Sequence, residues 1–254
     1  MTKFIDTPNS NTLAYNQLTG KNVGIVFLGG FNSDMEGKKA LYIEKWAKEN
    51  EHSFLRFDYS GHGQSSGTIE TTCFNDWYKD AEYIINNKTK DRQILIGSSM
   101  GAWIMLMLAK RVPEKISGMI GLAPAPDFPK ILIWDKMTSD EKRKLINDKK
   151  ITVKYEDGSK NDFSYKLIKD SFRNLTLSEN LYFDGPVYLY HGMADNAVPY
   201  DLSIKIIDTL KGTNNIKLLL EKDAGHRLSE AHQLANITKT VSYTHLTLPT
   251  ILRV

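Results

Sequence analysis

A serine inside a Gly-x-Ser-x-Gly pentapeptide is the first place where the sequence suggests chemistry. The segment "GSSMG" spans residues 97–101, and only Ser99 has a glycine both two positions before it and two positions after it. The flanking residues indicate an apolar strand before the segment and an apolar helix after it. A sharp strand-to-helix turn strains its central residue, and side chains at the two glycine positions would clash with neighbouring chains. We therefore predict that Ser99 presents its hydroxyl at the carboxyl edge of a sheet as a nucleophile.

A serine nucleophile needs a base, and the base needs a carboxylate to orient it. In chains with this kind of turn, the carboxylate and then the histidine follow the serine in sequence. Asp195 follows a predicted strand in "HGMADNAVP", and His226 follows the next predicted strand in "EKDAGHRLSE". Loops at the carboxyl ends of parallel strands share one edge of the sheet. We therefore predict that Ser99, Asp195 and His226 form a catalytic triad.

Other acidic and histidine side chains near these loops have simpler explanations. We expect roles in turns or at a helix start for three aspartates, Asp184, Asp201 and Asp223. His191 ends a predicted strand and is expected to be a packed, hydrogen-bonded side chain. His62 lies in the glycine-rich segment "YSGHGQSSG", where we also favour a structural role.

Acyl transfer also requires hydrogen-bond donors for the oxyanion of the tetrahedral intermediate. One donor is expected to be the backbone N–H of Met100, the residue after the nucleophile. The other is expected in the loop after the strand that ends at residues 28–30, where two glycines let the backbone turn inward. We therefore predict an oxyanion hole formed by the backbone N–H groups of Phe31 and Met100.

Apolar strand-like runs alternate with longer helix-like segments along most of the chain. Strands are predicted at residues 23–30, 53–59, 93–98, 116–124, 187–192 and 216–222, and helices at 36–50, 75–87, 100–112 and 201–210. Strands that are apolar throughout need cover on both faces, and alternation with helices is typical of a mainly parallel sheet. We predict an α/β fold of this kind, with one or two antiparallel edge strands in the first twenty residues.

The regular alternation stops between Asp127 and Phe183. This stretch is polar and rich in lysine, and it indicates helices with a hairpin around "ITVKYEDGSKNDF". A connection of this length needs a structure or a function of its own. We predict a helical lid insertion over residues 127–183 within a single domain of residues 1–240.

Composition and charge limit the class of protein. The chain has 254 residues with a formal net charge of +3 and no basic stripe, which argues against a nucleic-acid partner. No apolar run reaches the ~18 residues needed to span a bilayer, and the first ten residues lack the apolar core of a secretory signal. Cys73 is the only cysteine, which favours a reducing compartment. No cysteine–histidine cluster indicates a metal, and we predict no cofactor.

Four segments resemble the α/β-hydrolase superfamily: "FDYSGHGQSSG", "GSSMGAWIMLMLAKRVPEKISGMIGLA", "YHGMADNAVPYD" and "DAGHRLSE". Over residues 23–237 the chain is similar to a family of palmitoyl-protein thioesterases and acyl-glucuronide esterases with mitochondrial and bacterial members. The resemblance implies an α/β-hydrolase fold, Ser99 as nucleophile, Asp195 as carboxylate and His226 as base. It also implies hydrolysis of acyl thioesters or esters, with a small-molecule or acylated-protein substrate. Because no transit peptide is evident, we expect a cytoplasmic protein of bacterial type.

Other functions remain open at this point. A carboxylesterase or lipase that acts on small oxygen esters would use the same attack and oxyanion steps. A ligand-binding protein could keep the scaffold without turnover. A peptidase is disfavoured because the sequence identifies no acidic site for a free amine, and Ser99 at the turn disfavours a dehalogenase with an aspartate nucleophile.

The C-terminal segment "VSYTHLTLPT", residues 241–250, is similar to a translated sequencing-library adapter. It lacks helical periodicity and is expected to break the helix predicted through "SEAHQLANITKT". We interpret residues 241–254 as a non-native tail and leave them out of the fold prediction.

Overall fold

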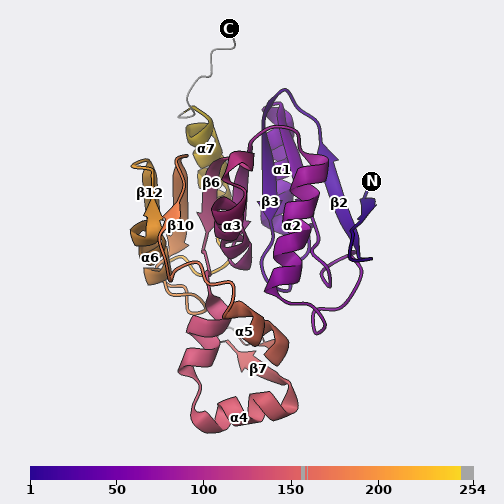
Figure 1. Ribbon diagram of the computed structural model, residues 1–254. Coiled ribbons are helices and arrows are strands. Elements are labelled where there is room, and N and C mark those ends of the chain that lie inside the picture. The colour runs from indigo at the N-terminus through magenta and orange to yellow at the C-terminus, as the bar shows by residue number, and fades with distance from the viewer. Residues whose placement is uncertain (156–157, 159, 247–254) are drawn as a thin grey trace.

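The computed structural model describes residues 1–155, 158 and 160–246, and eight strands of these residues form one sheet (Figure 1). The strand order is β1-β2-β4-β3-β5-β6-β10-β12. The strands are β1 Lys3–Asp6, β2 Thr12–Leu18, β3 Asn22–Leu28, β4 His52–Phe57, β5 Gln93–Ser98, β6 Ile116–Leu122, β10 Val187–Gly192 and β12 Ile216–Glu221. The six neighbouring strands β4, β3, β5, β6, β10 and β12 pair in parallel, whereas β2 is antiparallel to both β1 and β4. The predicted parallel sheet and antiparallel N-terminal strands are confirmed.

Helices cover both faces of the sheet. They are α1 Lys38–Glu49, α2 Phe74–Lys88, α3 Met100–Arg111, α6 Asp201–Thr209 and α7 Ala231–Leu246. Side chains of α1 and α7 pack into one apolar core, and those of α2, α3 and α6 pack into another. The buried residues of α1, Ala40, Ile43 and Ala47, recur at helical spacing and form the face that packs on the sheet. Among the described helices, none is both long and apolar enough to cross a membrane.

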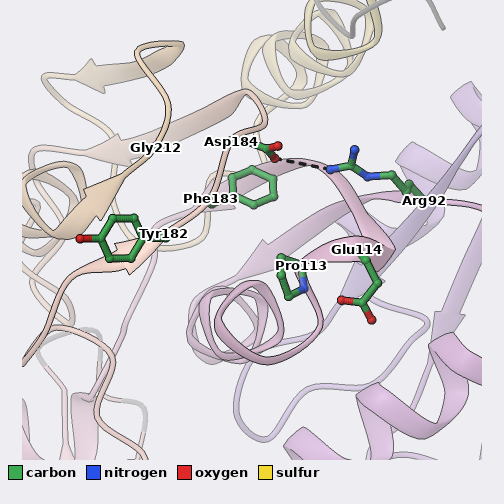
Figure 2. Close-up of a pocket in the computed structure, with 7 residues that line it drawn as sticks. All are labelled: Arg92, Pro113, Glu114, Tyr182, Phe183, Asp184 and Gly212. Carbon is green, nitrogen blue, oxygen red and sulfur yellow. Dashed lines mark ion pairs between the residues drawn. The ribbon is translucent and has the colours of Figure 1, made fainter.

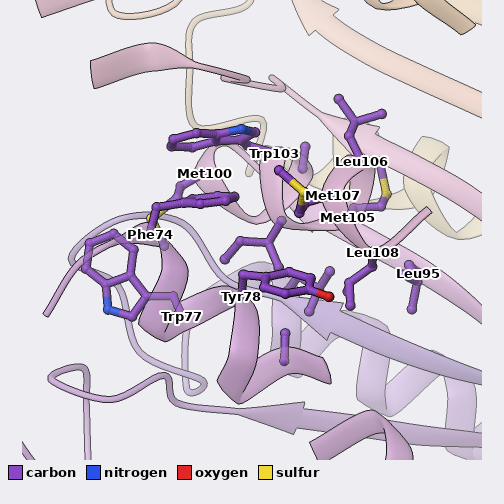
Figure 3. Close-up of a cluster of buried hydrophobic side chains, with 14 of the residues drawn as sticks. Phe74, Trp77, Tyr78, Leu95, Met100, Trp103, Met105, Leu106, Met107 and Leu108 are labelled. Carbon is purple, nitrogen blue, oxygen red and sulfur yellow. The ribbon is translucent and has the colours of Figure 1, made fainter. Parts of the chain in front are cut away.

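Helix α3 is buried on nearly every side, as its neighbours in Figure 3 show. Ten of its twelve residues are buried, so the helix needs cover from more than the sheet. The ring of Trp103 stacks on Phe74 of α2 with a centroid separation of 3.5 Å, and its indole N–H donates to the carbonyl oxygen of Asn174 at 3.1 Å. The helix that follows Ser99 is therefore held firmly between the sheet, α2 and the segment before β10.

The chain between β6 and β10 leaves the sheet and projects away from it (Figure 1). It contains helical turns at Pro129–Ile133 and Trp134–Lys136, α4 Ser139–Asp148, the antiparallel hairpin of β7 Lys150–Lys154 and β8 Lys160–Ser164, α5 Tyr165–Ser171, and β9 Leu181–Tyr182, which pairs with β11 Leu210–Lys211. We call residues 127–183 the insertion. The helices and hairpin predicted there are confirmed, and side chains such as Leu145 and Leu167 join the core of α2 and α3.

The end of the chain differs from the expectation drawn from the sequence. We expected the last helix to break at Val241, but α7 continues to Leu246 and the Val241 side chain is fully buried. The physical reason is spacing, because Leu234, Ile237 and Val241 lie on one helical face and pack in the same core. Residues 247–254 of the expected non-native tail lie outside the described residues.

Asp127 closes the base of the insertion. Its buried carboxylate accepts hydrogen bonds from the Thr176 backbone N–H at 2.9 Å, the Thr176 hydroxyl at 3.1 Å and the Leu177 N–H at 3.0 Å. These bonds join the first residue of the insertion to positions near its end. They also replace the hydrogen bonds to water that the carboxylate loses on burial.

We expect Asp127→Ala to lower the free energy of unfolding by about 3 kcal/mol, because it leaves buried donors without an acceptor. Urea denaturation followed by circular dichroism measures the change. Asp127→Asn is the matched control, since its amide oxygen keeps one acceptor and asparagine tolerates the positive φ of 56°. We expect a smaller loss for asparagine; equal losses in the two variants would contradict this account.

Candidate active site

Ser99 lies at the turn between β5 and α3 with a strained backbone. Its φ of 54° and ψ of −116° fall in a region that residues other than glycine rarely adopt. A Cβ on Gly97 would lie 2.5 Å from the Cα of Ala102, and one on Gly101 would lie 2.1 Å from the carbonyl oxygen of Leu28. Close approach of the backbone therefore requires both glycines, as predicted from the sequence.

Three side chains from three loops meet at this edge of the sheet. Nε2 of His226 lies 3.1 Å from Oγ of Ser99, and Nδ1 of His226 lies 2.7 Å from Oδ2 of Asp195. Ser99 and His226 are half-buried, whereas the side chain of Asp195 is fully buried. The residues predicted from their order along the chain thus lie together, and His226 is within reach of the Ser99 proton.

The loops that carry Asp195 and His226 are joined directly. Both leave the same edge of the sheet, because β10 and β12 are adjacent and parallel. The N–H of Ala194 donates to the carbonyl oxygen of Ala224 at 3.0 Å, and a Cβ on Gly192 would lie 2.1 Å from that oxygen. This close contact sets the position of His226 relative to Asp195.

Asp195 is an ionised carboxylate in a buried position. Its Oδ1 accepts the N–H groups of Ala197 and Val198 at 2.9 and 2.8 Å, and its Oδ2 lies 3.2 Å from His191 Nε2 and 2.7 Å from His226 Nδ1. Burial raises the pKa of Asp195, but hydrogen bonds from His191 and His226 and the charge of His226 together hold that pKa well below its ordinary value. The carboxylate therefore keeps the Nδ1–H of His226 directed toward it, which leaves Nε2 for the serine.

His191 has a role that the sequence did not reveal. It was expected to be packed and hydrogen-bonded, and it is fully buried with Nδ1 2.7 Å from Oγ of Ser203. That expectation is confirmed, but the contact of its other nitrogen with Asp195 was missed. His191 precedes Asp195 by four residues, but only the fold of the loop between them decides whether the two side chains meet, so the spacing did not signal this contact.

The loop after β3 lies beside Ser99. A Cβ on Gly30 would lie 3.5 Å from the Cβ of Ser99. The N–H of Phe31, the next residue, has no hydrogen-bond acceptor among the described residues. Met100 is the first residue of α3, so its N–H has no acceptor within that helix. These two N–H groups belong to segments next to Ser99, and their role as an oxyanion hole stays a prediction.

His62 supports the same loop. Its Nε2 accepts the N–H of Asn32 at 3.2 Å, and its Nδ1 lies 3.3 Å from the carbonyl oxygen of Ser60. This pattern places the ring proton on Nδ1, and burial lowers the pKa of His62, so the neutral form is favoured. The structural role predicted for His62 is confirmed, and the loop it supports is the one that carries Phe31.

The ring of Phe31 joins this loop to the insertion. It stacks on Phe163 of β8 with a centroid separation of 4.9 Å, and the Phe128 ring lies 6.0 Å away. Trp77 of α2 packs against it at 5.8 Å. An apolar wall that belongs partly to the insertion therefore lies next to the loop beside Ser99.

A surface pocket of about 460 Å³ lies at the opposite edge of the sheet (Figure 2). Arg92, which precedes β5, lines it together with Asp184, which precedes β10, and their side chains approach to 3.6 Å. Ser99 follows the other end of β5, about 20 Å away along the strand. This pocket is therefore separate from the three residues described above.

The chain is similar to known proteins over nearly its whole length. Residues 23–166 match the family described as "Serine aminopeptidase, S33". The chain is 34% identical to the mitochondrial palmitoyl-protein thioesterase ABHD10 of Bos taurus, over 94% of its own length and 78% of that protein. The structure matches alpha/beta hydrolase domain-containing protein 10 from mouse with a TM-score of 0.90 and 30% identity, covering 96% of this chain and 97% of the other. A crystal structure from Agrobacterium vitis S4 matches with a TM-score of 0.91 and 29% identity, covering 96% and 98%.

We expect Gly101→Ala to disrupt the turn at Ser99, because the added methyl group would overlap the carbonyl oxygen of Leu28. Overpacking of this kind costs about 1–3 kcal/mol, and a displaced serine would lower turnover as well. Thermal unfolding and hydrolysis of p-nitrophenyl butyrate measure both effects. Gly37→Ala is the control, since its Cβ would come no closer than 3.5 Å to Asp34. Wild-type values for Gly101→Ala would refute the close approach.

Proposed function

The chain belongs to the serine aminopeptidase S33 family of α/β hydrolases, and from this membership we propose that it cleaves acyl thioesters or esters through an acyl-enzyme on Ser99. The protein is a hydrolase, in keeping with its thioesterase relatives. The observation that carries the finer proposal is the imidazole of His226, which lies within hydrogen-bond distance of both Ser99 and Asp195. That arrangement supplies the base that a serine hydroxyl lacks at neutral pH.

In the proposed reaction, Nε2 of His226 takes the proton of Ser99 as the serine oxygen attacks the acyl carbonyl carbon. The N–H groups of Phe31 and Met100 donate to the oxyanion of the tetrahedral intermediate. The bond to sulfur or oxygen then breaks, and His226 gives its proton to the departing thiol or alcohol. A water molecule then gives a proton to His226 as it attacks the carbonyl carbon of the acyl-enzyme. The bond between that carbon and the Ser99 oxygen breaks, His226 returns the proton to Ser99, and the carboxylic acid is released.

The proposed substrate is a small-molecule or acylated-protein thioester or ester. The bovine relative is named a palmitoyl-protein thioesterase, which supports an acyl thioester. The packed rings of Phe31, Phe128 and Phe163 support an acyl group beside the serine, because aromatic side chains favour hydrocarbon neighbours over a charged chain. A cytoplasmic location stays a prediction, since that relative is named mitochondrial.

We further infer that residues 1–240 form one domain and that the insertion acts as its lid. Phe163 of the hairpin packs on Phe31, and Asp127 ties the base of the insertion together. An acyl chain that reaches Ser99 must therefore lie against, or displace, side chains of the insertion. Acyl preference is then set largely by residues 127–183.

Replacing the nucleophile tests the proposal directly. We expect Ser99→Ala to lose hydrolysis of p-nitrophenyl butyrate and of an acyl thioester by about 10⁵-fold or more, since the group that forms the acyl-enzyme is gone. A fluorophosphonate probe should label the wild type but not this variant. Ser98→Ala is the control, because Ser98 is the neighbouring serine outside the glycine pattern. Equal labelling of Ser99→Ala and wild type would reject the assignment.

Removing an aromatic ring from the insertion tests whether the insertion acts as a lid. We expect Phe163→Ala to raise kcat/KM for p-nitrophenyl octanoate relative to butyrate by about tenfold, because space for a longer chain opens beside Phe31. Phe163→Leu is a milder second variant, and thermal unfolding reports whether both are folded. Phe172→Ala is the control, since this residue packs on Trp134 at 5.6 Å. An unchanged ratio in the folded Phe163 variants would argue against the lid.

A further inference from the structure

We propose that His191 and Ser203 are positioning residues, which fix the Asp195 carboxylate against which His226 acts. The inference rests on the proposed function, because it concerns the same carboxylate. His191 is the fifth residue of β10 and Ser203 lies in the first turn of α6, and both side chains are fully buried. They extend the hydrogen-bonded series that begins at Ser99 to the helix after the Asp195 loop.

The neighbours of His191 fix its tautomer. Its Nε2 lies 3.2 Å from Oδ2 of Asp195 and 3.0 Å from the carbonyl oxygen of Val198, and both of these atoms are acceptors. Nε2 must therefore carry the ring proton. Its Nδ1 lies 2.7 Å from Oγ of Ser203, so in the neutral ring this nitrogen accepts the serine O–H. Every polar atom of the buried ring is thus partnered.

His191 completes the set of donors around the carboxylate. Oδ1 of Asp195 is held by the N–H groups of Ala197 and Val198, and Oδ2 is held by His226 and His191. With two donors on each oxygen, the carboxylate cannot rotate about its Cβ–Cγ bond without losing hydrogen bonds in a buried place. His191 therefore fixes the oxygen that orients the imidazole of His226.

Ser203 acts on the Asp195 carboxylate indirectly, because its hydroxyl fixes the tautomer of His191. If its O–H donor were removed, the His191 tautomer protonated on Nδ1 would become accessible. The lone pair of Nε2 would then face Oδ2 of Asp195 and the Val198 carbonyl oxygen, and these contacts are repulsive. Ser203 has no hydrogen bond to Ser99 or His226 among the described residues, so its effect on turnover must pass through His191.

Substitution at both positions tests the proposal with p-nitrophenyl butyrate as substrate. We expect His191→Phe to lower kcat and kcat/KM together by about a hundredfold with KM unchanged, because misplaced catalytic groups affect the transition state and not substrate binding. Ser203→Ala should lower both by about tenfold. His191→Gln should recover most of the loss, because its amide N–H can reach the position of the ring N–H.

Matched variants at the opposite edge of the sheet separate positioning from loss of packing. His52 begins β4 and Ser117 is the second residue of β6, and both are buried. His52→Phe removes a buried imidazole that is hydrogen-bonded to the Val23 carbonyl oxygen there, and Ser117→Ala removes a buried hydroxyl that has no hydrogen-bond partner among the described residues. We expect these controls to alter the melting temperature while leaving kcat near wild type.

Nitrogen NMR of the histidines gives a readout that packing alone would not move. The ¹⁵N shifts of His191 should report a proton on Nε2 in the wild type and a mixture of tautomers in Ser203→Ala. The downfield proton of His226 Nδ1–H should shift in the same variant. If His191→Phe does not fold, Ser203→Ala, which keeps the ring, carries the test.

The outcomes are distinct for the two proposals. A kcat within twofold of wild type in folded Ser203→Ala, or the same effects in His191→Phe as in His52→Phe, would overturn the positioning role while the acyl-enzyme mechanism stands. Activity of Ser99→Ala at the wild-type level would instead reject the mechanism itself.

Discussion

The left-handed backbone at Ser99 is the constraint on which the rest of the site depends. A residue with a side chain costs about 1–3 kcal/mol in such a conformation, so its neighbours must hold it. The N–H of Ser99 donates to the Leu122 carbonyl oxygen at 2.9 Å, and its own carbonyl oxygen accepts from Ala102 and Ala125. The turn is thus fixed to β6, to α3 and to the start of the chain that leads into the insertion. A hydroxyl held in this way presents one defined direction to a base.

Sheet topology explains why the other two loops must be tied together. Ser99 follows β5, and His226 follows β12, which is three strands away in the order β5-β6-β10-β12. At about 4.8 Å per strand, the two strand ends are separated by roughly 14 Å, so the loop that carries His226 has to reach back across the edge. The backbone hydrogen bond from the Ala194 N–H to the Ala224 carbonyl oxygen anchors that loop to the one carrying Asp195. The hydrogen bond between the Asp195 carboxylate and Nδ1 of His226 then orients the imidazole so that Nε2 lies next to the Ser99 oxygen.

Much of the fold and the central geometry of the site could be predicted from sequence. The helices were predictable because apolar residues recur at helical spacing, and the strands because they are short runs that are apolar throughout. The meeting of Ser99, Asp195 and His226 followed from strand ends sharing one edge. The partner of His191 could not be predicted, because it depends on how the loop after β10 folds within the protein. The continuation of α7 through Val241 could not be predicted from residues 241–250 themselves, which resemble a translated adapter and lack helical periodicity. It depends on the packing of Val241 in the same core as Leu234 and Ile237.

The stacking of Phe31 on Phe163 limits how the insertion can change during evolution. One of these rings sits on the loop that we propose holds the oxyanion, and the other belongs to the segment that we propose selects the acyl group. Grafting residues 127–183 from a relative would therefore replace the packing partner of a loop in the parent scaffold. New substrate preference in this enzyme cannot be obtained by exchanging that segment as an independent module, since each donor segment must also bring a side chain that fits Phe31.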